Sequence, residues 1–315
     1  MKLYLILTSI ICLTLALLPL GFMNSPSRQS TREEVSVSDK SSEGTVSVFL
    51  TKESKTVDIE TMDYLVGAVA AEMPASYHME ALKAQAVASY SYLKWLRKNA
   101  DNPDYDISSD PATHQGYLTE EEMREKWGDK YETWKNRIYE AVSSVESEYL
   151  TYKGEPILAL FHAISPGMTQ DSKDVWESEL SYIKPQTAPG DALSPDFDSE
   201  LTVPCQKISE VFSAGSDIAD SELIDISQLS DTAFIKEIKL GEKTVSAGDI
   251  ASRLGLRSPY FTAEYNQGNY IFKVKGYGHG LGMSQYSADY MARQGSDYKE
   301  ILTHFYEGVK IEKTQ

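Results

Sequence analysis

A proline between two alanine-rich apolar stretches is the feature that most restricts the fold of this chain. Residues 61–72 carry apolar side chains at helical spacing, and Pro74 forces Met73 out of helical angles, so a helix ends there. A second helix is predicted over residues 79–99. Small residues on one stripe of a helix allow close backbone packing, and here they are Ala81, Ala84 and Ala88. The sequence therefore predicts a tightly packed helical pair.

The N-terminal 23 residues are predicted to form a transmembrane anchor. Residues 3–23 contain no charged side chain, and a stretch of this length is about long enough to cross a bilayer core. Lys2 favours a cytoplasmic N-terminus, so the rest of the chain is expected outside the cytoplasm. A cleaved signal peptide is the competing interpretation, but residues 19–23 offer no small-x-small cleavage site.

Residues 24–44 are polar and serine-rich, which predicts a flexible linker. Beyond them, strands are predicted at 45–51, 149–152 and 269–275, and helices follow one another at 120–147 and after residue 284. Helices and strands mix without βαβ alternation. We therefore expect an α+β fold with short antiparallel strands: one large extracytoplasmic domain over residues 45–315, with or without a smaller inserted lobe.

Charge and cysteine content exclude several classes of function. The net charge of −17 argues against a nucleic-acid partner, because phosphate binding needs clustered lysine and arginine. Only Cys12 and Cys205 are present, and Cys12 lies in the predicted membrane segment. The sequence therefore predicts neither a disulfide framework nor a C-x-x-C metal site.

Glu72 is a lone acid at the end of an apolar helix. Burial disfavours a charged carboxylate, and the negative carbonyl end of a helix acts in the same direction, so both raise its pKa. A carboxyl that stays protonated near neutral pH can act as a general acid. The alternative is an exposed glutamate without a role.

Lys83 lies on the next helix. Its ammonium group either reaches the surface or points toward Glu72.

Glycine occupies every second position from residue 276 to residue 282. In an extended strand this pattern leaves one face bare, which a ligand can approach closely. Neither a dinucleotide fingerprint nor a phosphate-binding loop fits, because Leu281 replaces the third glycine and no Gly-Lys-Ser/Thr follows. Aromatic, hydroxyl and amide side chains nearby favour sugar recognition: Tyr277, His279, Ser284, Gln285 and Tyr286. A purely structural glycine turn is the alternative.

Three long segments resemble the SpoIID/LytB family. They are YLVGAVAAEMPASYHMEALKAQAVASYSYL, LTYKGEPILALFHAISPGMTQDSKDVW and GYGHGLGMSQYSADYMARQGSDYKEILTHFYEGVKI. The resemblance extends over about residues 45–312. The segment THQGYLTEEEMREKWGDKYE, together with the anchor, is more similar to the sporulation members of the family than to the amidase enhancers.

This resemblance implies a peptidoglycan lytic transglycosylase of forespore engulfment, with Glu72 as the catalytic acid. It also implies peptide-stripped glycan strands as substrate, and a cell-wall amidase and a further membrane protein of the engulfment complex as partners. Lys83 is expected to bind the lactyl carboxylate of muramic acid or to adjust the pKa of Glu72. The candidate substrate-binding residues are Lys83, His162, Ser165, Tyr277, His279, Ser284, Gln285 and Tyr286.

The chain departs from the family pattern in its middle motif. Residues 165–167 read Ser-Pro-Gly where paired glycines are usual, Gln170 replaces a glutamate, and Trp176 precedes Glu177 instead of glycine. Some sporulation members bind zinc near a histidine that matches His114. No cysteine lies near His114 here, so we expect neither a metal nor another cofactor.

Two other functions are compatible with the sequence. A hydrolytic muramidase needs a second acid, for which Asp106 and Asp110 are the candidates. A non-catalytic glycan-binding protein would only stimulate an amidase. For all three functions, the expected location is the cell membrane, with a single span and the domain outside the cytoplasm.

Overall fold

The computed structural model describes residues 44–99, 102, 104–176, 179–213, 223–229 and 234–314. The predicted anchor and nearly all of the predicted linker lie outside these ranges. Among the helices that the structure describes, none has both the length and the apolar character needed to cross a bilayer.

The described chain begins with a β-hairpin. Strands β1 (Thr45–Leu50) and β2 (Lys55–Glu60) pair antiparallel, and β3 (Ile107–Ser108) adds to β1 in parallel. Alternate residues of β1 are buried, as the apolar–polar alternation predicted. These are Val46, Val48 and Leu50.

Helices α2 (Thr61–Glu72) and α3 (Met79–Asn99) form the predicted pair. Met73 ends α2 in an extended conformation, with φ −125° and ψ 138°, as expected for a residue before proline. Helix α3 lies at the centre of the domain and packs against α2, α5, β4, α9 and α10. Its alanine stripe is fully buried, which permits this crowding.

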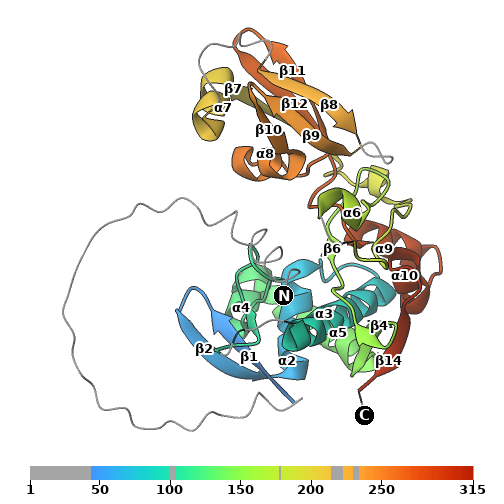
Figure 1. Cartoon of the computed structure of the whole chain (residues 1–315). Coiled ribbons are helices and arrows are strands. Elements are labelled where there is room, and N and C mark those ends of the chain that lie inside the picture. The colour runs from blue at the N-terminus through green and yellow to red at the C-terminus, as the bar shows by residue number, and fades with distance from the viewer. Residues whose placement is uncertain are drawn as a thin grey trace.

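The main domain contains further helices and strands, of which α5, α9, α10, β4 and β5 contact α3 (Figure 1). The helices are α4 (Glu120–Trp127), η1 (Gly128–Lys130), α5 (Tyr131–Ser144), α6 (Ser172–Val175), η2 (Asp191–Leu193), α9 (Gln285–Arg293) and α10 (Tyr298–Phe305). The strands are β4 (Glu148–Tyr152), β5 (Glu155–Pro156), β6 (Phe161–His162), β13 (Met283–Ser284) and β14 (Lys310–Lys313). One sheet has the order β14–β4–β5, and β6 pairs in parallel with β13.

A second hydrophobic core lies in a smaller lobe formed by residues 198–275, at the top of Figure 1. Its elements are β7 (Asp198–Pro204), α7 (Cys205–Phe212), β8 (Ile224–Leu229), β9 (Ile235–Leu240), β10 (Lys243–Ser246), α8 (Ala247–Leu254), β11 (Phe261–Asn266) and β12 (Asn269–Lys275). They form two antiparallel sheets, β10–β9–β8 and β11–β12–β7. The lobe is inserted into the main domain, which resumes after residue 275. The fold as a whole is α+β.

The glycine-rich segment 276–282 joins the lobe back to the main domain, and it is not an extended strand. Its four glycines have φ between 68° and 103°, a region that other residues rarely adopt. A Cβ atom at Gly276, Gly278 or Gly282 would come too close to atoms of segment 160–166. The prediction of a bare, ligand-accessible face is therefore wrong, because protein backbone occupies that face.

We predict that Gly282→Ala destabilises the protein far more than Gly154→Ala. Both glycines have positive φ, which costs an alanine about 1–2 kcal/mol. A Cβ at Gly282 would also overlap the Leu160 carbonyl oxygen, whereas Gly154 faces open space. Because a backbone oxygen cannot move aside cheaply, we expect a total loss of about 3 kcal/mol or more at Gly282. Urea unfolding measures the free energy of unfolding of both variants. Equal losses for Gly282→Ala and Gly154→Ala would contradict the packing of segment 276–282 against segment 160–166.

Candidate functional site

The carboxylate of Glu72 projects from the last turn of α2 and is covered by the loop that precedes α4. Its Oε1 accepts a hydrogen bond from the backbone N–H of Gly116. The loop is fixed by Gln115, whose Nε2 donates to the Tyr64 hydroxyl (2.7 Å) and to the Ser89 carbonyl (3.2 Å). A Cβ at Gly116 would lie 3.0 Å from Oε1, so glycine is what permits this close approach.

Burial raises the pKa of Glu72 above its ordinary value, as the sequence predicted. The Gly116 N–H and the charge of Lys126 act in the opposite direction but do not offset the burial. Tyr64 and Tyr92 share this environment. Burial is the main cause that raises the pKa of both phenols, and the Glu72 charge adds to it. The carboxyl is thus poised to remain protonated at a higher pH than an exposed glutamate.

Two cavities of about 370 Å³ each meet at Glu72. One, the tryptophan pocket, is lined by residues 71–76, Lys126, Trp127 and Trp134. The other, the hairpin pocket, is lined by Leu50, Thr51, Lys52, Glu53, Ala71, Glu72, Ser109, Pro111, Gly116, Tyr117, Leu118, Thr119 and Glu122. Only Ala71 and Glu72 belong to both linings. A carboxyl between two adjoining cavities can act on a bond whose two sides occupy different pockets.

Arg137 and Asp289 hold the loop that follows Glu72. Arg137 on α5 donates to the carbonyl oxygens of Ala75 (3.0 Å) and Tyr77 (2.8 Å). On the other side, Asp289 on α9 accepts from the His78 N–H (2.5 Å) and from Arg293 Nε (2.7 Å). The wall of the tryptophan pocket is therefore anchored to two helices that are distant in sequence.

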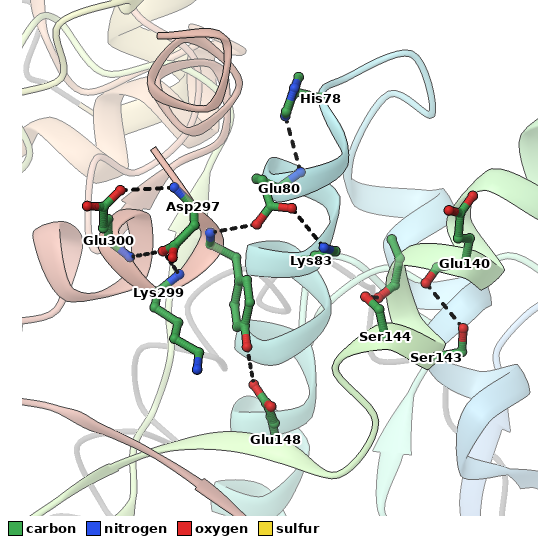
Figure 2. A network of polar contacts seen from close by, with 12 residues as sticks. His78, Glu80, Lys83, Glu140, Ser143, Ser144, Glu148, Asp297, Lys299 and Glu300 are labelled. Carbon is green, nitrogen blue, oxygen red and sulfur yellow. Dashed lines mark hydrogen bonds and ion pairs between the residues drawn. The ribbon is translucent and has the colours of Figure 1, made fainter. Parts of the chain in front are cut away.

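Lys83 does not face Glu72. Its Nζ lies 2.7 Å from Glu80 Oε1, and Glu80 also accepts the Tyr298 N–H (3.0 Å), so the lysine belongs to the polar network in Figure 2. The charge that moderates the pKa of Glu72 comes instead from Lys126. Both expected roles of Lys83 assumed proximity to Glu72, and this geometry supports neither.

Ser165 and Ser284 are fully buried around Asp191. The Ser165 N–H donates to Asp191 Oδ2 (2.6 Å), and the Ser284 hydroxyl lies 2.8 Å from each carboxylate oxygen. Ser287 on α9 adds a third donor at 2.8 Å. Burial raises the pKa of Asp191, and the serine donors oppose this shift. The structure therefore places these two serines in a structural cluster that ties segment 165–191 to α9.

His162 and Gln285 are also buried. His162 Nδ1 lies 3.1 Å from the Leu281 carbonyl, and burial lowers the pKa of this imidazole to about 4. Gln285 Nε2 donates to Gln85 Oε1 on α3 at 3.1 Å. Both side chains join elements of the core.

Three of the candidates remain at least partly accessible. His279 is exposed, and its Nδ1 accepts the Leu281 N–H (3.1 Å). Tyr277 is half exposed beneath the Arg257 guanidinium, and Tyr286 packs edge-on against Tyr77. None of the predicted substrate-binding residues lines either pocket at Glu72. The structure thus brings Glu72, but not its predicted companions, into the candidate site.

Sequence reasoning missed Lys126, Trp127, Trp134 and Gly116. Trp127 ends α4 and Trp134 lies in α5, so their spacing of seven residues does not place them on one face of a single helix. Nothing local connects either residue to Glu72, because α2 and the α4–α5 region meet only in the folded chain.

The second acids considered for a hydrolase have other contacts. Asp106 pairs with Arg97 (2.8 Å) and accepts the Ser47 N–H (3.0 Å). Asp110 Oδ1 accepts the Ala112 N–H within its own turn (2.9 Å). Neither lines a pocket at Glu72. Across the described residues, no group of three or more His, Cys, Asp or Glu side chains is arranged to hold a metal ion.

We predict that Glu72→Gln stabilises the fold at neutral and alkaline pH. The folded pKa lies above the unfolded one, so the ionised carboxylate costs folding free energy above the folded pKa, and this cost vanishes below the unfolded pKa. Glutamine keeps the acceptor for Gly116 without the charge. The gain in melting temperature should therefore be larger at about pH 8 than at about pH 4, measured by circular dichroism. A gain that does not depend on pH would contradict this electrostatic account.

Comparison with known proteins identifies relatives over most of the chain. The family model described as "SpoIID: Stage II sporulation protein" matches residues 51–152. Stage II sporulation protein D of Bacillus subtilis (strain 168) is 31% identical over 275 residues, which cover 86% of this chain and 80% of that protein. The protein of the same name from Bacillus amyloliquefaciens is 32% identical, with the same coverage.

A more distant relative is the Amidase enhancer of Bacillus subtilis (strain 168). It is 26% identical over 305 residues, which cover 78% of this chain but only 40% of that protein. The family model includes Glu72 and both tryptophans of the site. From these similarities, the chain belongs to the SpoIID family of sporulation proteins.

Proposed function

We propose that the protein is a lytic transglycosylase that cleaves the bond between N-acetylmuramic acid and N-acetylglucosamine in peptide-stripped peptidoglycan strands. The observation that carries this proposal is the Glu72 carboxyl, with its raised pKa, at the junction of two cavities. A polymer that passes through both cavities would present its scissile bond to this carboxyl. Membership of a sporulation family is consistent with a cell-wall substrate.

One acid is sufficient for this reaction. Glu72 donates its proton to the glycosidic oxygen, and the bond from that oxygen to C1 of muramic acid breaks. The C6 hydroxyl of the same sugar attacks C1, and the Glu72 carboxylate takes the hydroxyl proton, which closes the 1,6-anhydro ring and restores the acid. Because the nucleophile belongs to the substrate, little entropy is lost in positioning it.

The contacts of Glu122 favour this reaction over hydrolysis. An inverting hydrolase needs a second carboxylate that activates water, and a retaining one needs a carboxylate nucleophile. The other acids near Glu72 are Glu53 and Glu122, in the lining of the hairpin pocket. Glu122 pairs with Lys52 and accepts the Thr119 N–H (2.9 Å) in a helix cap, so its carboxylate is held in structural contacts. Glu53 is an exposed residue of the β1–β2 turn.

We further propose that the protein works outside the cytoplasm, anchored in the cell membrane by its N-terminal segment. Its partners there would be a cell-wall amidase, which removes stem peptides from the glycan, and a membrane protein of the engulfment complex. The similarity to an amidase enhancer supports a functional link to an amidase.

We predict that Glu72→Gln lowers the rate of strand cleavage at least about 100-fold, the usual loss when a general acid is removed. Peptide-free glycan strands are digested with the wild-type and variant chains, and the products are identified by mass spectrometry. Wild-type protein should yield 1,6-anhydro muramic ends. Glu140→Gln, on the exposed face of α5, is the matched control and should cleave at the wild-type rate.

The same digestion tests the alternatives. Reducing ends in place of anhydro ends would mean hydrolysis. If wild-type protein cleaves nothing but stimulates an amidase, the protein is a non-catalytic enhancer, the alternative that the relationship to the Amidase enhancer favours.

We predict that cleavage slows as the pH rises through the pKa of Glu72, because only the protonated acid can donate. The alkaline limb should lie above the usual range of a glutamate, since burial raises this pKa. Lys126→Met removes a charge that lowers the same pKa, so the limb should move to higher pH. The measurement is the pH profile of kcat/KM for both proteins, and a limb that Lys126→Met shifts to lower pH would contradict this assignment.

A further inference from the structure

The two pockets at Glu72 differ in charge. Besides Glu72 itself, the hairpin pocket is lined by one lysine and two glutamates, Lys52, Glu53 and Glu122, and Lys52 is paired with Glu122. The tryptophan pocket has Lys126 and, among its described lining residues, no carboxylate other than Glu72. When Glu72 is protonated, the lining of the hairpin pocket therefore carries a net negative charge and that of the tryptophan pocket a net positive charge. An anionic ligand is expected to prefer the tryptophan pocket.

Lys126 is placed to receive such a ligand. It lies in the last turn of α4, its side chain is solvent-accessible, and its Nζ donates to the Ala70 carbonyl at the end of α2 (2.9 Å). An ammonium group has three donors, so the one contact that the structure gives Lys126 leaves capacity for a carboxylate. The hydrogen bond to Ala70 also fixes the ammonium group close to Glu72, which it influences electrostatically.

The rest of this pocket suits a sugar ring. Trp127 and Trp134 line it together with Pro74. Indole faces provide flat apolar contact for the C–H face of a pyranose, while a nearby cation fixes its orientation through a charged substituent. The chemistry of the pocket therefore matches a sugar that carries a carboxylate.

We propose that the tryptophan pocket is the subsite for peptide-free N-acetylmuramic acid, with Lys126 binding its lactyl carboxylate, and that the hairpin pocket takes the neutral N-acetylglucosamine. This assignment rests on the proposed function and fixes the direction of the strand across Glu72. The muramic residue whose C6 hydroxyl attacks lies on the Lys126 side, and the leaving sugar lies on the side of the β1–β2 turn. Lys126 thus takes the role that sequence reasoning gave to Lys83.

Binding to the full-length chain carrying Glu72→Gln tests the assignment without turnover. Three ligands are compared: peptide-free strands, the same strands with their lactyl carboxyls amidated, and a chitin oligomer, which lacks the lactyl group. Adding Lys126→Met should weaken binding of the free-acid strands about tenfold, as expected for one charge-assisted hydrogen bond. Binding of the other two ligands should change less than about twofold on the same scale.

Lys83→Met in the same background is the matched control, since Lys83 pairs with Glu80 away from both pockets. It should leave all three affinities unchanged. If Lys126→Met weakens binding of all three ligands equally, the lysine only orders the end of α2. If it weakens binding of none of them, the lactyl carboxylate does not bind at Lys126. Either result overturns the subsite while strand binding by the parent chain still supports the proposed function. If the parent chain binds no strand, both proposals fail.

Discussion

The hydrogen bond between the Gly116 N–H and the Glu72 carboxylate is the interaction on which the site depends. It joins a helix end to a loop 44 residues later in the sequence, and the loop in turn is fixed by Gln115. Together these contacts half-bury the acid while leaving it at the junction of two cavities. A carboxyl that is half-buried but still adjoins open space combines a raised pKa with access to substrate, which is what proton donation requires.

Local signals were sufficient to predict the elements that present Glu72. Pro74 fixed the end of α2, and the alanine stripe of α3 predicted a buried helix, because both effects act within a few residues. The companions of Glu72 could not be predicted in this way. Lys126 and Trp134 reach the site only because α2 packs against α4 and α5. Lys83 is nearer in sequence, but Glu80, one turn away, already neutralises it.

The glycine-rich segment shows why a motif rich in reactive side chains can be structural. The alternation of glycine suggested an extended strand, but positive φ at each glycine curls the backbone against segment 160–166. Ser284 then lies in the interior, where its hydroxyl donates a hydrogen bond to the buried carboxylate of Asp191 and so offsets the unfavourable desolvation of that group. A buried carboxylate needs such donors, so hydroxyl groups that resembled ligand-binding groups are used to hold the two parts of the main domain together.

The overall charge of the protein adds a physical reason for a local cation at the site. At a net charge of −17, the chain repels a polymer that carries a carboxylate on every second sugar. This repulsion is screened beyond about 8–10 Å at physiological ionic strength. A lysine inside the pocket acts at shorter range, where screening is weak, so Lys126 can bind an anion that the surface as a whole disfavours. Under the proposed function, recognition of an acidic strand by this acidic protein would therefore depend on the few charges that line the pockets, and not on the average charge of the surface.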